Sequence, residues 1–121
     1  MIGVGDDLVD LDRFRTAVER TPGLLQRCFT EGERAYAEQR SDPVERYAVR
    51  WAAKEALMKA LGVGLGACEL RDIEVVRAES GQPSLVLHGA AAVLADDRGV
   101  TALHLSLTHT ATAAHAVVVA E

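Results

Sequence analysis

The spacing of apolar residues changes from a helical pattern to a strand pattern along the chain, and this change constrains the fold more than any other feature. Residues 43–61 follow a helical spacing, whereas Thr101–Thr108 alternate in polarity. A nearly all-apolar run, Ala113–Ala120, follows a polar turn. Helices in the first half followed mainly by strands predict an α+β fold, with an antiparallel sheet packed by helices.

Turn and capping residues set the expected boundaries of the first elements. A short glycine-rich strand over residues 2–5 precedes a helix predicted from Leu8 to about Glu19, which the sequence at residues 21–23 interrupts. Thr30 and Glu33 have the spacing of a capping box, so a second helix is expected from residue 31 to about residue 39.

The longest helix is expected over residues 43–61. Asp42 precedes it as a capping acid, and Gly62 is placed to end it in a left-handed conformation. Two short apolar runs, residues 72–76 and 84–87, flank a turn and predict a β-hairpin, and residues 89–97 predict a short helix.

Length and composition indicate one ordinary folded domain covering residues 1–121, of which 26% are charged. No run approaches the roughly 18 apolar residues of a membrane helix, and no signal peptide precedes the first acids, so we expect a cytoplasmic protein. A net charge of −5 argues against general nucleic-acid binding. Cys28 and Cys68 are isolated and are expected to act as small buried apolar residues.

Glu55 lies on the apolar stripe of the long helix, where an unpaired acid is costly. Two interpretations are open. Lys59 stands one turn further on and can form a buried salt bridge with Glu55. Alternatively, Glu55 is a metal ligand beside cations that bind phosphate, because Arg46, Arg50 and Lys54 follow one another on what we expect to be the solvated side of the helix.

Three further groups of residues suit a phosphorylated ligand. Asp6 and Asp7 follow a glycine-rich strand, where Mg²⁺ could bind beneath a diphosphate. A flexible loop containing Gly62, Gly64 and Gly66 follows the basic helix, although it matches no dinucleotide-binding pattern. His104, Ser106 and Thr108 share one face of the alternating strand, which is either solvated or a wall of hydrogen-bond donors.

Taken together, these segments resemble the holo-[acyl-carrier-protein] synthase family over essentially the whole chain. The resemblance rests on the strand and acids of residues 3–8, on residues 29–33, on the block from Arg50 to Gly62 and on the segment from His104 to His109. It implies a short-type 4′-phosphopantetheinyl transferase fold, which assembles as a homotrimer with each active site at a subunit boundary. It also implies Mg²⁺-dependent transfer of phosphopantetheine from coenzyme A to a serine of an apo acyl carrier protein, releasing adenosine 3′,5′-bisphosphate.

The resemblance also implies roles for particular residues. Asp7 and Glu55 are expected to hold Mg²⁺ and, with Lys59, to form the catalytic group. Arg50 and His104 are expected at the 3′-phosphate end of coenzyme A. The full set expected to contact coenzyme A is Arg50, Lys54, Lys59, Gly62, Gly64, Gly66, His104, Ser106 and Thr108. The base that accepts the serine proton stays open among Glu55, Asp6 and a metal-bound water.

The resemblance further implies that Arg13 docks the acidic carrier protein, and Arg15, Arg20 and Arg27 add positive charge nearby. The carriers are expected to serve fatty-acid synthesis, with polyketide or peptide synthesis also open. Ala113–Ala120 is either the core of the trimer or a central buried strand. Two other functions remain: a Mg²⁺-dependent hydrolase of nucleotide diphosphates and a non-enzymatic coenzyme A-binding module.

Overall fold

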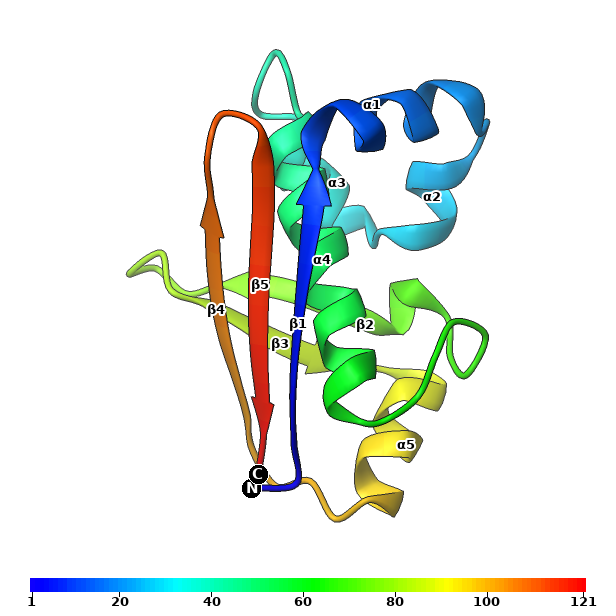
Figure 1. The fold of residues 1–121 in the computed structure, drawn as a ribbon, viewed down its shortest axis with the longest axis vertical. Helices are drawn as coiled ribbons and strands as arrows, with labels where there is room; N and C mark the ends of the chain where they lie inside the picture. Colours follow the sequence, from blue (N-terminus) through cyan, green and yellow to red (C-terminus); the bar gives the residue numbers. More distant parts are fainter.

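The structure is a computed structural model that describes residues 1–121, and it has the α+β architecture expected from the sequence (Figure 1). Its elements in chain order are β1 (Gly3–Asp10), α1 (Leu11–Arg20), α2 (Leu24–Cys28), α3 (Glu31–Ala37), α4 (Val44–Ala60), the short 3₁₀ helix η1 (Leu70–Asp72), β2 (Ile73–Arg77), β3 (Pro83–Leu87), α5 (Gly89–Asp97), β4 (Leu103–His109) and β5 (Ala113–Ala120). None of these helices combines the length and apolar character needed to cross a membrane.

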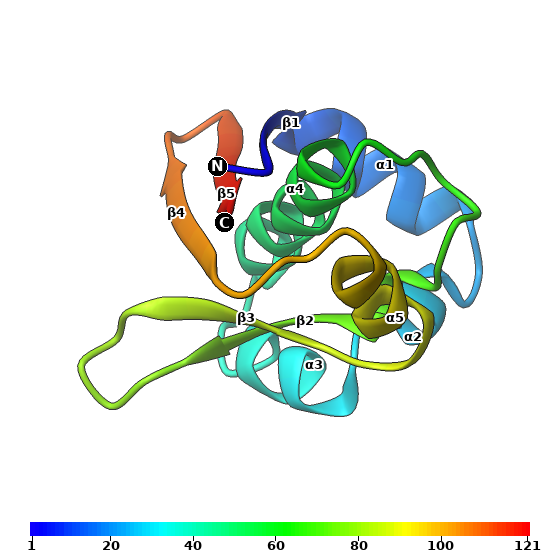
Figure 2. The same ribbon diagram turned by 90° about the horizontal axis from the view of Figure 1, so that it is seen from below.

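Two antiparallel sheets lie around α4. The first has the strand order β1-β5-β4, so β5 is its central strand, and the second is the β2-β3 hairpin. The long helix α4 packs against one face of the first sheet (Figures 1 and 2). In this sheet Asp7 pairs with Ala116, and Leu107 pairs with the same residue from the other side. The hairpin and α3 lie on the other side of α4 (Figure 2).

Small residues allow β1 and α4 to approach closely. A Cβ atom on Gly5 would lie 2.0 Å from the carbonyl oxygen of Ala56, and one on Gly3 would lie 1.9 Å from that of Ala60. Neither distance is possible for real atoms, so only glycine fits at these two positions. Alanines of α4 and β5 fill the same interface and are fully buried. The close contact fixes which side chains of β1 and α4 face one another.

Several predicted elements are confirmed. Thr30 and Glu33 form the capping box of α3, with a Glu33 N to Thr30 Oγ1 distance of 3.1 Å. The hairpin, α5 and β5 are present, and Gly62 adopts a left-handed φ of 72° after the end of α4. The two cysteines are free, and Cys28 is buried.

The prediction for the N-terminal segment is wrong in its boundaries. The strand continues to Asp10 because residues 3–10 pair along the whole length of β5, and this pairing overrides the helical pattern that seemed to begin at Leu8. The helix α1 therefore begins at Leu11, capped by the Asp10 side chain. The sequence pattern also missed the short helix α2. Pro43 is the N-cap residue of α4, one position later than expected, but the Asp42 carboxylate still accepts from the Val44 N–H at 3.3 Å, as expected of a capping acid, and it also binds Arg15 at 2.8 Å.

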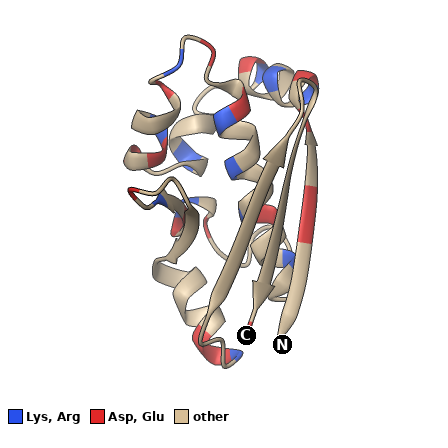
Figure 3. Ribbon diagram, turned by 90° about the vertical axis from the view of Figure 1, so that its left-hand side faces the viewer, with Lys and Arg blue, Asp and Glu red and all other residues tan.

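Strand β5 is a central strand with two different faces. Ala114, Ala116, Val118 and Ala120 face α4 and are buried, whereas Val117 and Val119 on the outer face are half-buried. On the neighbouring strand β1, Val4 and Leu8 are 58% and 69% exposed. Figure 3 shows that the strands of this sheet carry almost no charged residues, apart from acids on β1. No element of the chain covers this outer face.

Candidate active site

A cleft of about 360 Å³ lies where β1, α1 and α4 meet. Asp7 enters it from β1, Glu55 from α4 and Arg13 from α1, and Phe14 and Trp51 form part of its apolar lining. The close contact at Gly5 brings the two acids into this one cleft, although 48 positions separate them in the sequence (55 − 7). The structure therefore places Asp7 and Glu55 in the lining of one cleft.

Lys59 adds a cation to this group from the next turn of α4. Its ammonium nitrogen Nζ lies 3.2 Å from Asp7 Oδ1 and donates to the backbone carbonyl of Asp6 at 2.9 Å. The Glu55–Lys59 salt bridge that the sequence left open does not form, because Lys59 pairs with Asp7 instead. Asp6 itself does not line the cleft, and its carboxylate is on the outer sheet face, 3.4 Å from His115.

The electrostatics of the cleft favour a cation between the two acids. Burial raises the pKa of the Glu55 carboxyl, the negative charge of Asp7 raises it further, and Lys59 opposes both effects. No hydrogen bond or ion pair involves the Glu55 carboxylate. The two carboxylates therefore repel one another, and Lys59 balances only part of the negative charge. An additional cation at this point would relieve the repulsion.

The prediction that Lys54 lies on the solvated side of α4 is wrong. This side chain is fully buried, and its ammonium donates to Glu33 at 2.7 Å and to the carbonyl oxygens of Leu70 and Ile73. All three N–H donors of Lys54 are therefore occupied inside the protein. The predicted contact of Lys54 with coenzyme A conflicts with this burial, because no donor is left for a ligand.

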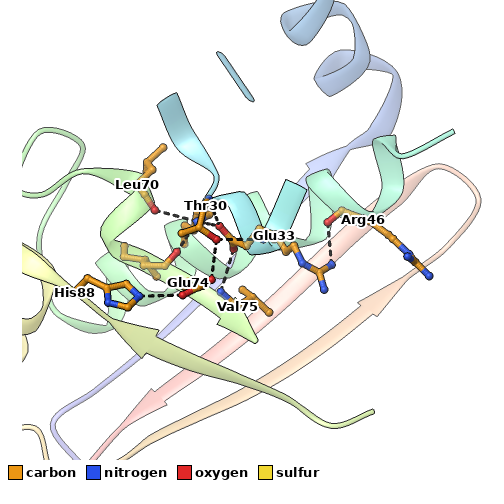
Figure 4. A network of polar contacts seen from close by, with 10 residues as sticks. Thr30, Glu33, Arg46, Leu70, Glu74, Val75 and His88 are labelled. Atoms are coloured by element: carbon orange, nitrogen blue, oxygen red, sulfur yellow. Dashed lines mark hydrogen bonds and ion pairs between the residues drawn. The ribbon is translucent and has the colours of Figure 1, made fainter. Parts of the chain in front are cut away.

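The buried pair belongs to a larger polar network that joins α3, α4 and the hairpin (Figure 4). Glu33 also accepts from the backbone N–H of Val75 at 3.0 Å, and the Thr30 hydroxyl donates to Glu74 at 2.8 Å. His88 lies 2.9 Å from the other oxygen of Glu74. Because each buried charge has partners, this network can hold α3 and the hairpin in place beside α4.

A second pocket, of about 270 Å³, lies on the hairpin side of α4. Its lining includes Arg46 and Arg50 from α4, Arg77 from β2, Tyr36 from α3 and His109 from β4. Arg50 is only 4% exposed and donates to the carbonyl oxygen of Arg46 at 3.1 Å. The structure thus places Arg50 in a basic pocket.

The predicted companion of Arg50, His104, lies elsewhere. His104, Ser106 and Thr108 share the exposed outer face of the sheet, and His104 lies 3.2 Å from Glu121 near the end of the chain. Instead, His109 at the other end of β4 lines the pocket of Arg50, 3.4 Å from Glu45. Sequence reasoning missed His109 because it assigned coenzyme A binding to the face of β4 that carries His104, Ser106 and Thr108. In the structure, only the end of the strand at His109 reaches this pocket.

The cleft and the basic pocket lie on opposite sides of α4. Residues 45, 46, 49 and 50 line the pocket, whereas residues 51 and 55 line the cleft, and the two share no lining residue. At about 3.6 residues per turn, these two sets face away from one another.

The remaining predicted residues are distributed as follows. Gly62, Gly64 and Gly66 are in an exposed loop and line no pocket. Arg13 and Arg20 line a groove on α1 that adjoins the cleft through Arg13. Arg27 donates to the carbonyl oxygen of Pro22 at 3.1 Å, at the start of the turn before α2.

Comparison with known proteins agrees with this fold. Residues 3–118 match the family model described as the 4′-phosphopantetheinyl transferase superfamily. The chain is 43% identical to the holo-[acyl-carrier-protein] synthase of Moorella thermoacetica, covering 100% of this chain and 94% of the relative. It is 49% identical to that of Clavibacter michiganensis subsp. michiganensis, covering 98% and 94%.

Solved structures of such synthases have the same fold. The structure from Neisseria meningitidis is 33% identical and superposes with a TM-score of 0.89, covering 100% of this chain and 99% of that one. The structure from Helicobacter pylori, described as a complex with coenzyme A, is 28% identical with a TM-score of 0.85 and covers 98% and 99%. Sequence and structure thus agree over the full length, and the chain belongs to the holo-[acyl-carrier-protein] synthase family of phosphopantetheinyl transferases.

Proposed function

We propose that this holo-[acyl-carrier-protein] synthase transfers 4′-phosphopantetheine from coenzyme A to a serine of an apo acyl carrier protein and releases adenosine 3′,5′-bisphosphate. The observation that carries the proposal is the cleft lined by Asp7 and Glu55, with Lys59 paired to Asp7, next to the basic groove of α1. Structures of relatives from Helicobacter pylori and Bacillus anthracis are described as coenzyme A complexes, which supports the same substrate here.

The acids of the cleft fit a Mg²⁺ ion. Asp7 and Glu55 offer two carboxylates, and no cluster of three or more metal-binding side chains occurs in the chain. Mg²⁺ is commonly held by one or two carboxylates, with water and substrate phosphate oxygens completing its coordination. When bound there, the ion would neutralise charge on the diphosphate and stabilise the leaving group.

The residues of the chain would then position the reactants. Lys59 is 54% exposed in its side chain, so its ammonium can leave Asp7 and bind a diphosphate oxygen. In the reaction, the serine oxygen forms a bond to the β-phosphorus, and the bond between that phosphorus and the bridging oxygen breaks. The bridging oxygen leaves with adenosine bisphosphate, and the serine proton passes to a base. Asp6 is a poor base because its carboxylate lies on the outer sheet face.

The same enzyme is proposed to act as a homotrimer. Two observations support an assembly: the uncovered outer face of the first sheet exposes the apolar side chains of Val4 and Leu8, and the basic pocket faces away from the carboxylate cleft on α4. A neighbouring subunit that packs on the sheet could bring its Arg50 pocket to the Asp7 cleft. Coenzyme A would then lie between two subunits, with its diphosphate in one and its 3′-phosphate in the other.

The acceptor would dock on α1. Arg13 borders both the cleft and the groove that contains Arg20, so a carrier bound there would have its serine close to Asp7 and Glu55. Arg15 is less available because Asp42 holds its guanidinium. The net charge of −5 does not prevent this contact, because association depends on the local basic patch.

Intact-protein mass spectrometry tests the proposal directly. An apo acyl carrier protein is incubated with this enzyme and coenzyme A, with and without Mg²⁺. A metal-dependent mass gain of one phosphopantetheine group supports the transfer. Release of adenosine bisphosphate without a carrier would instead indicate a hydrolase. Tight coenzyme A binding without either product, unchanged by a chelator, would indicate a binding module.

A further inference from the structure

Three arginines surround one aromatic ring in the basic pocket. The guanidinium carbons of Arg46, Arg50 and Arg77 lie 3.9, 4.5 and 5.0 Å from the centroid of the Tyr36 ring. These arginines come from α4 and β2, and the ring comes from α3. Each distance is within the range of a cation–π contact. Tyr36 is thus the one side chain that all three arginines share.

No carboxylate pairs with any of these three arginines. Arg46 donates to the Tyr36 carbonyl at 2.6 Å and to Gln39 at 3.2 Å, and Arg77 donates to the Gly81 carbonyl at 3.1 Å. All of these acceptors are neutral. The one acid that lines the pocket, Glu45, lies beside His109 instead. The pocket therefore has an uncompensated positive charge.

Arg50 shows how unfavourable this arrangement is without an anion. It is 4% exposed, and its Nε atom has no hydrogen-bond partner. Burial lowers the pKa of its guanidinium, and the charge of Arg46 adds to this effect, although Glu33 opposes it. A buried donor without a partner is costly, so a bound anion that accepts from it would be stabilised.

The position of Tyr36 depends on the buried network of Lys54. Tyr36 follows Glu33 by three residues on α3, and Glu33 is fixed by Lys54, Thr30 and Val75. Helix α3 can therefore not move without breaking buried bonds. The ring is held rigidly by its own helix, and it in turn limits where the flexible arginine side chains can lie.

We infer that Tyr36 is a positioning residue that preassembles Arg46, Arg50 and Arg77 as a clamp for a doubly charged phosphate monoester. This clamp lets the enzyme distinguish coenzyme A from coenzyme A that lacks its 3′-phosphate. The inference rests on the proposed function. A phosphate monoester suits the clamp because it presents three terminal oxygens to several donors, whereas each phosphorus of an internal diphosphate presents two.

The test compares coenzyme A with 3′-dephospho-coenzyme A as substrates for the wild type, Tyr36→Phe and Tyr36→Leu. The ratio of kcat/KM values for the two substrates measures recognition of the phosphate. We expect Tyr36→Phe to keep this ratio and Tyr36→Leu to lower it by about tenfold, through a higher KM for coenzyme A. The kcat/KM for the dephosphorylated substrate should not change. An unchanged ratio, or an equal loss on both substrates, would overturn the inference.

Arg77→Ala provides a second route in case Tyr36→Leu does not fold, because Arg77 is exposed. Its matched control is Arg98→Ala, which removes the same charge from the exposed end of α5. Only Arg77→Ala should lower the ratio. Calorimetry with adenosine 3′,5′-bisphosphate and adenosine 5′-monophosphate measures the same selectivity without transfer. If the wild type transfers nothing, the proposed function fails, and calorimetry still decides the role of Tyr36.

Discussion

The two polar sites on α4 differ in how their charges are balanced. In the cleft, Lys59 pairs with Asp7, while Glu55 contributes a second negative charge in the same space. In the basic pocket, three arginines share one ring and have no acidic partner. A cation would therefore reduce the repulsion between the acids of the cleft, and an anion would balance the positive charge of the pocket. A substrate with a metal-bound diphosphate at one end of a nucleotide and a phosphate monoester on the other would satisfy both.

The most severe way to break this complementarity is to neutralise Asp7. We expect Asp7→Asn to lower the rate of transfer about a thousandfold or more. The substitution removes one carboxylate ligand of the Mg²⁺ ion that neutralises the diphosphate, while the shape of the cleft is kept. The measurement is kcat/KM with coenzyme A and an apo carrier. Binding of adenosine 3′,5′-bisphosphate in the basic pocket should survive. Activity within tenfold of wild type would remove Asp7 from the metal site.

Mixing two inactive variants sharpens the comparison, because it asks whether the cleft and the pocket of one active site belong to different subunits. Asp7→Asn and Arg50→Gln are unfolded and refolded together in equal amounts. Random assembly of a closed oligomer would restore about a quarter of the sites, since each restored site takes its cleft from one variant and its pocket from the other. Each variant refolded alone is the control. No recovery in a mixed oligomer would place both halves of the site in one subunit.

The next prediction concerns the buried ion pair of Lys54 and Glu33. Lys54→Met leaves Glu33 charged and unpaired, and we expect it to lower the free energy of unfolding by about 3–5 kcal/mol. Lys54→Met combined with Glu33→Leu removes both charges and should recover part of this loss. Urea denaturation measures each variant. If Lys54→Met alone unfolds at the wild-type urea concentration, the pair does not hold α3 against α4.

Elements with local sequence signals were predicted correctly. Features that depend on contacts between distant segments were missed. The capping box of α3 depends on two residues three positions apart, and it was found. The length of β1 depends on pairing with β5 more than a hundred residues later, so a local helical pattern at Leu8 was misleading. Lys54 looked solvated because its partner Glu33 lies 21 residues away on another helix.

The candidate site shows the same division. Asp7, Glu55 and Lys59 were identified from the family resemblance. The cleft brings the two acids together, and Lys59 pairs with Asp7. The arginine cluster could not be predicted, because Tyr36, Arg50 and Arg77 come from three elements whose packing is not visible in the spacing of residues. A partial signal was nevertheless present in α4, where four basic residues stand against only two acids, Glu45 and Glu55.

A smaller effect is expected at the carrier groove next to the cleft. Arg13→Glu should raise the KM for the carrier by about tenfold and leave the KM for coenzyme A unchanged, because a charge on the rim of a docking surface acts mainly on association. The effect should weaken as salt is added. Arg15→Glu is the control, since Asp42 already holds Arg15. An unchanged KM for the carrier would place docking elsewhere.

The smallest expected effect concerns stability. Glu55→Gln should abolish transfer but keep or slightly raise stability at pH 7, by less than about 1 kcal/mol. The pKa of Glu55 in the folded chain lies above its ordinary value of 4.5, so the folded state binds more protons than the unfolded state between these two values. Stability from this group is therefore present below pH 4.5 and is lost as the pH rises through the folded pKa.

Glutamine does not titrate, so the stability of Glu55→Gln relative to wild type should increase between pH 4 and pH 7, as measured by thermal unfolding in low salt. Glu31→Gln, at an exposed position at the start of α3, controls for the loss of one negative charge. A variant that is less stable than wild type at pH 7 would mean that Glu55 forms a stabilising ion pair in solution, as in the Glu55–Lys59 interpretation. A variant as stable as wild type but inactive would show that this carboxylate is kept for catalysis at the expense of stability.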